Sequence, residues 1–156
     1  MHLAEGILPA LHALGWTGAA VPLLVWSLRG EQKSQSEDPR SSILIAGATS
    51  LLFAATMLPL PVPVVGATSH LCLTPLLSLI VGLRRIFWPS FFVVLLQAML
   101  FGHGGLTTLG VNSVVLGLIG PAITAGLWRA LKGFGVSESY SLGVACGLGA
   151  LSIYVA

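Results

Sequence analysis

Charged side chains are scarce in this chain of 156 residues. Seven Lys and Arg and five Asp and Glu make up 8% of the sequence, whereas hydrophobic residues make up 55%. Soluble domains carry roughly 25% charged residues, so the composition excludes an ordinary soluble domain and predicts an integral membrane protein. Cysteine is scarce as well: Cys72 and Cys146 lie in apolar runs without a Cys-x-x-Cys spacing, which argues against a structural disulfide.

The sequence also lacks the motifs that an enzyme or an ATPase would need. Outside positions 29–40 the only acids are Glu5 and Glu138, and no His-Glu-x-x-His spacing occurs, which excludes a membrane zinc enzyme of that kind. No Walker A glycine loop is present, so the chain has no ATP site of its own. We therefore expect neither enzymatic activity nor a nucleic-acid partner.

Apolar runs account for most of the chain and predict an all-α integral membrane protein. A helix needs about 20 apolar residues to cross roughly 30 Å of hydrocarbon. We expect one transmembrane domain over residues 1–156 with about six transmembrane helices, at 7–28, 42–58, 64–83, 86–101, 111–128 and 140–156. Residues 29–40, the only strongly hydrophilic stretch, are expected to form a solvated loop. Gly143-x-x-x-Gly147 is a weak signature of close helix packing.

A proline-rich segment interrupts this pattern. Pro59, Pro61 and Pro63 alternate along the chain and forbid a regular helix there, and the apolar run that follows, 71–83, is too short to span a bilayer. We expect the Pro/Gly-rich loop to dip into the membrane from the outer side and to carry His70 with it. The alternative is an ordinary third helix from about Val64, with His70 on its surface.

The basic residues alternate between loops in a way that predicts orientation. All seven fall in three loops, namely Arg29, Lys33 and Arg40, then Arg84 and Arg85, then Arg129 and Lys132. The positive-inside rule places these loops in the cytoplasm, and the N-terminus on the outer side of a multi-pass protein of the plasma (inner) membrane. The outer face then holds His2, His70 and His103, three of the four histidines.

The first two residues offer a metal three nitrogens from one short segment. These are the α-amine of Met1, the backbone amide nitrogen of His2 and the Nδ1 of its imidazole. They close a five-membered and a six-membered ring in nearly one plane, the geometry that suits Ni(II) or Cu(II), and a second histidine could complete the plane. Because His2 is not small, removal of Met1 is disfavoured. The alternative is that His2 is simply an exposed terminal residue.

Three motifs, taken together, resemble those of a known family. MHLAEG (1–6), PLPVPVVGATSHL (59–71) and FGHGGLTTLGVN (101–112) look like the motifs of the membrane substrate-binding (S) component of cobalt/nickel energy-coupling-factor (ECF) transporters, the CbiM/NikM-like family. The resemblance implies a metal site formed by Met1, His2 and His70. We expect a supporting shell of His103, Asn112 and Ser69, because metal-bound imidazoles need second partners.

The same resemblance implies a function. The chain would capture Ni2+ or Co2+ with high affinity as the substrate-specific component of an ECF-type ABC transporter, a source of cobalt for cobalamin biosynthesis. Its partners would be a coupling membrane subunit and cytoplasmic ATPase subunits. One alternative is a non-transporting membrane scaffold subunit. A haem-binding membrane protein is a weaker alternative, because three of the four histidines fall in loops rather than on facing helices.

Overall fold

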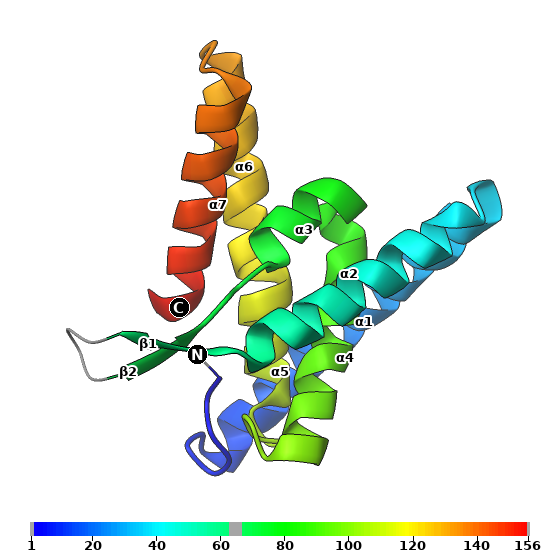
Figure 1. The fold of residues 1–156 in the computed structure, drawn as a ribbon. Coiled ribbons are helices and arrows are strands. Elements are labelled where there is room, and N and C mark those ends of the chain that lie inside the picture. The colour runs from blue at the N-terminus through cyan, green and yellow to red at the C-terminus, as the bar shows by residue number, and fades with distance from the viewer. Residues whose placement is uncertain (1, 63–66, 156) are drawn as a thin grey trace.

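The computed structural model describes residues 2–62 and 67–155, and it is built mainly of helices (Figure 1). In chain order the elements are α1 (Ala10–Glu37), α2 (Arg40–Met57), β1 (Pro59–Val62), β2 (Ala67–His70), α3 (Thr74–Val81), α4 (Leu83–Phe101), α5 (Leu109–Val114), the π-helix η1 (Val115–Ile119), α6 (Gly120–Gly133) and α7 (Glu138–Val155). The helices α5, η1 and α6 follow one another without a break.

Four helical segments in the described part of the chain are long and apolar enough to cross a membrane: Ala10–Glu37, Arg40–Met57, Leu83–Phe101 and Leu109–Gly133. The chain is therefore a mostly helical, multi-pass membrane protein, as its composition predicted. Six spans are not confirmed, because α3 has only 8 residues and α7 lies outside this group.

The hydrophilic stretch 29–40, predicted to be a solvated loop, is instead helical up to Glu37. Pairs of side chains four residues apart support these turns: Gln35 donates to Glu31 at 2.9 Å, and Lys33 lies 3.7 Å from Glu37. The helix stops at Asp38, whose extended conformation is typical of a residue before proline. The absence of an apolar stripe was therefore misleading, because a helix that leaves the bilayer does not need one.

The predicted helix over 64–83 is replaced by a β-hairpin and a short helix. Strand β1 pairs antiparallel with β2, with Pro59 opposite His70 and Val62 opposite Ala67. Pro59 and Pro61 alternate, so the donors they lack fall on one edge of the strand, where a two-stranded ribbon tolerates proline. Pro63 and Val64 lie outside the described residues. Entry of this segment into the membrane stays a prediction.

A buried ion pair joins α1 to α4 at the end of the molecule that carries the basic residues. Arg85 Nε lies 2.7 Å from Glu31 Oε2, and both side chains are largely buried. Arg85 also donates to the hydroxyl of Ser41 at the start of α2. Because an unpaired charge would be costly here, this contact fixes the three helices relative to one another. Arg85, one of the basic residues assigned from the sequence to a cytoplasmic loop, instead lies in α4 and is neutralised within the fold.

Helices α6 and α7 stand side by side as a hairpin (Figure 1) and pack through small residues. A Cβ added to Gly120 would lie 2.6 Å from Ile153 Cδ1, and one added to Gly149 would overlap the hydroxyl of Thr124. The pair singled out in the sequence, Gly143 and Gly147, faces no atom within 4 Å. The close contact therefore lies further along α7, near its C-terminal end.

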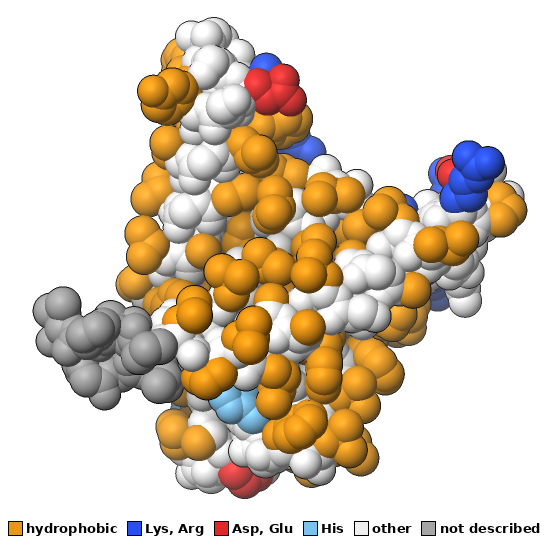
Figure 2. Space-filling model, viewed as in Figure 1, with side chains coloured by type: hydrophobic (Ala, Val, Ile, Leu, Met, Phe, Trp, Pro, Cys, Tyr) orange, Lys and Arg blue, Asp and Glu red, His pale blue; other side chains and the backbone are white. Residues whose placement is uncertain are grey.

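Charge and histidine separate in space as they do in the sequence. Figure 2 shows Lys and Arg at the tip where α1 meets α2 and near the α6–α7 turn, whereas the visible histidine surface lies lower on the molecule. Figure 1 places the N-terminal end, the β-hairpin and the C-terminal end of α7 close to one another in this lower part.

Candidate metal centre

The N-terminal segment is held in place through the backbone N–H and C=O of a single one of its residues, Leu3. Leu3 N donates to Asn112 Oδ1 at 2.9 Å, and Asn112 Nδ2 donates back to Leu3 O at 3.1 Å. Thr108 Oγ1 donates to the same carbonyl at 2.7 Å and accepts the other Asn112 N–H at 3.1 Å. Both N–H donors and the carbonyl oxygen of the buried Asn112 amide are hydrogen-bonded. The predicted supporting residue Asn112 thus positions the segment that carries His2.

The glycine-rich loop after α4 allows this segment to approach closely. A Cβ on Gly105 would lie 2.6 Å from Glu5 Cα, and Gly104 has a φ of +88° with His2 Cβ 3.3 Å from where its own Cβ would be. A side chain at Gly105 would push the segment away, and one at Gly104 would strain the backbone. Thr107 N donates to Glu5 Oε2 at 3.2 Å, and these contacts with Thr107 lower the pKa of Glu5.

Three imidazole rings meet where the N-terminal segment, the β-hairpin and this loop converge. The rings of His2 and His103 have centroids 5.1 Å apart, and those of His70 and His103 are 4.8 Å apart, each pair edge to face. The fourth histidine, His12, is exposed on α1. The fold therefore gathers residues from the three motifs that the sequence analysis grouped together.

Four nitrogens of these rings are buried and have no hydrogen-bond partner among the described residues. Both ring nitrogens of His2, the Nδ1 of His70 and the Nε2 of His103 are buried in this state. A buried polar atom without a protein partner is rare, and it usually meets a bound water or ion or serves the function of the protein. Such nitrogens, if neutral, carry the lone pairs that transition metals bind.

Burial keeps the imidazole of His2 in its neutral form. Burial is the largest cause that lowers the pKa of His2 to about 3, and His103, the N-terminal amine and His70 lower it further. Burial and the neighbouring His70 also lower the pKa of His103. At neutral pH the imidazole of His2 is uncharged, so a metal need not displace a proton from it.

Side chains alone do not complete a metal site. Within residues 2–62 and 67–155, no group of three or more His, Cys, Asp or Glu side chains could hold an ion. The predicted ligand set has only two side chains, those of His2 and His70, and takes its other donors from the amine of Met1 and the amide of His2. Met1 lies outside the described residues.

Tyr154 is part of this region, and sequence reasoning missed it. Its hydroxyl lies 2.6 Å from Ser69 Oγ and donates to His70 O at 2.7 Å. The predicted supporting residue Ser69 therefore contacts Tyr154. Nothing in the apolar run 140–156 distinguished this tyrosine, since its partners lie more than eighty residues away in the chain.

A cavity of about 120 Å³ adjoins His2 between η1 and α7, with Asn112 and Tyr154 among its lining residues. The π-helical turn η1 supplies Val115 and Leu116 to the same cavity. Single π-helical turns inside longer helices occur frequently at functional sites.

Together, the fold and this region define a multi-pass α-helical membrane protein with a histidine-lined site closed by its own N-terminal segment. The chain belongs to the CbiM family, because residues 2–156 match the model described as "Cobalt uptake substrate-specific transmembrane region". The resemblance read from the three motifs is thereby confirmed.

Individual relatives agree with this assignment. A cobalt transport protein of Pelobacter propionicus is 33% identical over 155 residues, covering 99% of this chain and 68% of that protein. One from Carboxydothermus hydrogenoformans is 30% identical, covering 99% of this chain and 63% of that protein. A crystal structure described as a truncated transition metal transporter superposes with a TM-score of 0.87 at 26% identity, covering 98% of this chain and 70% of that one. These relatives are transporters rather than enzymes, as the sequence predicted for this chain.

Proposed function

We propose that the chain captures a divalent transition-metal ion, Co2+ or Ni2+, from outside the cell as the substrate-specific component of an ECF-type ABC transporter. The observation that carries this proposal is the convergence of His2, His70 and His103, whose buried ring nitrogens lack partners among the described residues. Membership of a cobalt uptake family supports the same conclusion.

In this proposal the ion is bound by the amine of Met1, the amide nitrogen and Nδ1 of His2, and the imidazole of His70. The buried and unpartnered Nδ1 of His2 is available for this role. Asn112 and Thr108 hold the carbonyl of Leu3 and thereby keep the chelating segment in place. His103 lies beside both ligand rings and would orient them, as second partners of metal-bound imidazoles do.

Two arguments about the identity of the metal point in opposite directions. Four nitrogens in one plane favour Ni(II), whereas the curated relatives are described as cobalt transport proteins. Competition between the two ions for the purified protein would decide which is the substrate.

The remaining parts of the proposal concern the assembly. We place the N-terminus outside the plasma (inner) membrane, with residues 1–156 as one transmembrane domain, and the basic loops facing a coupling membrane subunit and cytoplasmic ATPase subunits. The separation of Lys and Arg from the histidines supports this orientation (Figure 2).

Metal analysis of protein purified with a native N-terminus and a C-terminal tag tests the proposal. We expect one Co2+ or Ni2+ per chain and uptake of the same ion by cells that also produce the partner subunits. Protein that neither retains nor binds either ion would overturn the proposal. Binding without any uptake in the complete system would instead favour a scaffold subunit.

A further inference from the structure

The hydroxyl of Tyr154 forms hydrogen bonds with the last two residues of strand β2, Ser69 and His70. It donates to His70 O at 2.7 Å, and His70 N donates to it at 3.3 Å. Because a tyrosine hydroxyl has one proton and that proton is used by the His70 carbonyl, Ser69 Oγ must be the donor in the 2.6 Å contact. One hydroxyl thus makes three hydrogen bonds to two consecutive residues.

Strand β2 needs such a partner because its outer edge finds none within the hairpin. His70 pairs with Pro59, and because proline has no N–H, these two residues form a pair without hydrogen bonds between them. The N–H and C=O of His70 therefore point away from β1 and toward Tyr154. A two-stranded hairpin is marginal by itself, so the Tyr154 hydroxyl, which bonds both groups, fixes the end of the hairpin that carries the predicted fourth ligand.

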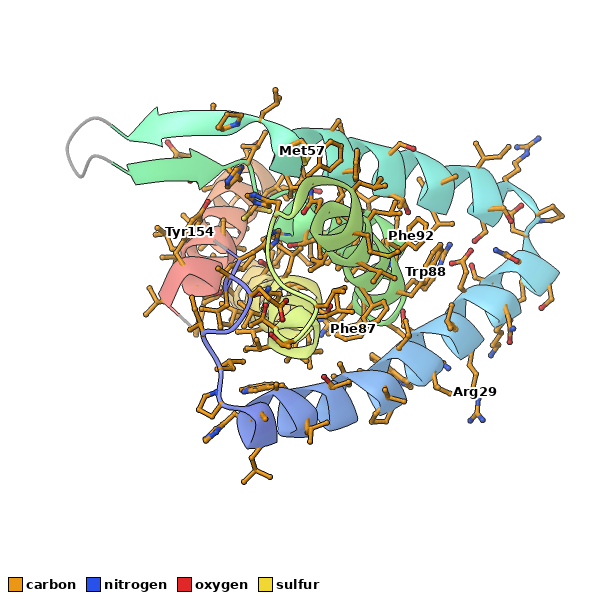
Figure 3. All side chains as sticks on the ribbon, turned by 90° about the horizontal axis from the view of Figure 1, so that it is seen from below. Arg29, Met57, Phe87, Trp88, Phe92 and Tyr154 are labelled. Atoms are coloured by element: carbon orange, nitrogen blue, oxygen red, sulfur yellow. The ribbon has the colours of Figure 1, made fainter. Side chains whose placement is uncertain are left out.

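The position of Tyr154 is itself fixed by α7. The neighbouring Ile153 is 4% exposed, and it packs against Gly120 so closely that a Cβ there would lie 2.6 Å from it. Figure 3 shows Tyr154 on α7, on the side between the β-hairpin and the N-terminal segment. The tyrosine also lines the cavity beside His2, so α7 forms one wall of the candidate metal centre.

We propose that Tyr154 is a positioning residue. It holds the backbone of His70 in place for metal capture, and it thereby couples helix α7 to the β-hairpin that carries His70. This inference rests on the proposed function. Tyr154 does not act as a ligand, because its hydroxyl is fully used by Ser69 and His70. A loop that is held before the ion arrives binds the ion more tightly, since less order has to be created on binding.

The labelling rate of the natural cysteine Cys72 measures how firmly the end of strand β2 is held, and this measurement needs no bound metal. It lies two residues after His70, with Sγ 3.9 Å from the Tyr154 hydroxyl, and is half-buried. The chain has only one other cysteine, Cys146, so a Cys146→Ala background leaves Cys72 as the single thiol. In detergent-purified full-length protein, Tyr154→Phe should raise the labelling rate of Cys72 several-fold in the metal-free state.

The same variant should change metal binding. We expect Tyr154→Phe to weaken Ni2+ affinity by about 10–100-fold, the range typical of changes beyond the first ligands, and to raise the half-saturating metal concentration for uptake more than it lowers the maximal rate. A shift of the ligand-field absorption band should accompany this change, because a displaced His70 leaves one position to water. Ser69→Ala removes one of the three hydrogen bonds and should give a smaller effect in the same direction.

Tyr140→Phe is the matched control, because Tyr140 is the only other tyrosine and is 75% exposed near the start of α7. It should leave labelling, affinity and spectrum unchanged. If Tyr154→Phe labels and titrates like the wild type, the inference is wrong while the proposed function stands. If the wild-type protein itself binds neither Ni2+ nor Co2+, both are overturned.

Discussion

The imidazole rings of His70 and His103 lie edge to face with centroids 4.8 Å apart, although they belong to different loops. Each ring has a buried nitrogen without a partner among the described residues, Nδ1 in His70 and Nε2 in His103. Because the ring of His103 also lies 5.1 Å from that of His2, either histidine could supply the fourth donor of the proposed planar site.

Alanine variants of the two histidines separate ligand from supporting residue. We expect His70→Ala to lose metal binding, because a chelate with three donors keeps one labile position. His103→Ala should weaken binding by about 10–100-fold, and His12→Ala, at an exposed position on α1, should have no effect. Titration of each purified variant with Ni2+ and Co2+ is the measurement. A His70→Ala protein that binds normally beside a His103→Ala protein that does not would mean that the two roles are reversed.

The residues of the site could be predicted because their chemistry is local in sequence, whereas the contacts that position them could not. The chelating start at His2 and the glycines of the third loop follow from short motifs. Tyr154 could not be identified, because its role depends on α7 returning beside His70. The role of Asn112 was predicted only as support, and the structure adds that it binds the main chain of Leu3.

An alanine inserted between Met1 and His2 tests the terminal chelate. The insertion keeps every side chain but adds one peptide unit, so that the amine, the amide and Nδ1 no longer close adjacent five- and six-membered rings. We expect metal binding and uptake to be abolished. A chain with a permanent N-terminal tag should fail for the same reason, whereas a C-terminal tag should not. Unchanged uptake by the insertion variant would show that the amine is not a ligand.

Gly105→Ala tests the close approach of the N-terminal segment. A Cβ there would lie 2.6 Å from Glu5 Cα, so we expect the segment to be displaced and metal affinity to fall by about 10–100-fold. Gly126→Ala is the control, since nothing lies within 4 Å of a Cβ at Gly126 and alanine favours a helix. Metal titration and a thermal melt of both variants are the measurements. Equal affinity in the two would argue that the glycine loop does not position the chelate.

The stability of the metal-free protein should depend on pH through His2. Its pKa is lowered to about 3 in the folded protein, against about 6.5 in an unfolded chain. Between these values the unfolded chain binds more protons, so the contribution is fully present above pH 6.5 and is lost as the pH falls toward 3, by up to about 1.4 kcal/mol per pH unit. His2→Gln, which also favours retention of Met1, should flatten this part of the curve. Parallel stability curves for the two proteins would contradict this prediction.

Where the fold departed from the sequence-based expectation, long-range pairing or local side-chain contacts decided the outcome. The proline-rich run forms a strand because β2 lies opposite it, and periodicity within the run gives no sign of this pairing. Helix α1 continues to Glu37 with local side-chain pairs, Gln35 with Glu31 and Lys33 with Glu37, and its Glu31 also pairs with Arg85 of α4. Apolar run lengths contain no information on either kind of contact.

Cysteine labelling tests the orientation in the membrane. In a background without Cys72 and Cys146, Ser36→Cys places a thiol in the last turns of α1, and Leu106→Cys places one in the glycine loop, where Leu106 is 56% exposed. If the basic end faces the cytoplasm, a membrane-impermeant reagent should label Leu106→Cys in intact cells and should label Ser36→Cys only after lysis. Leu106 is preferable to Thr107, because Thr107 contacts Glu5. The reverse labelling pattern would place the histidines inside the cell and would exclude capture from outside.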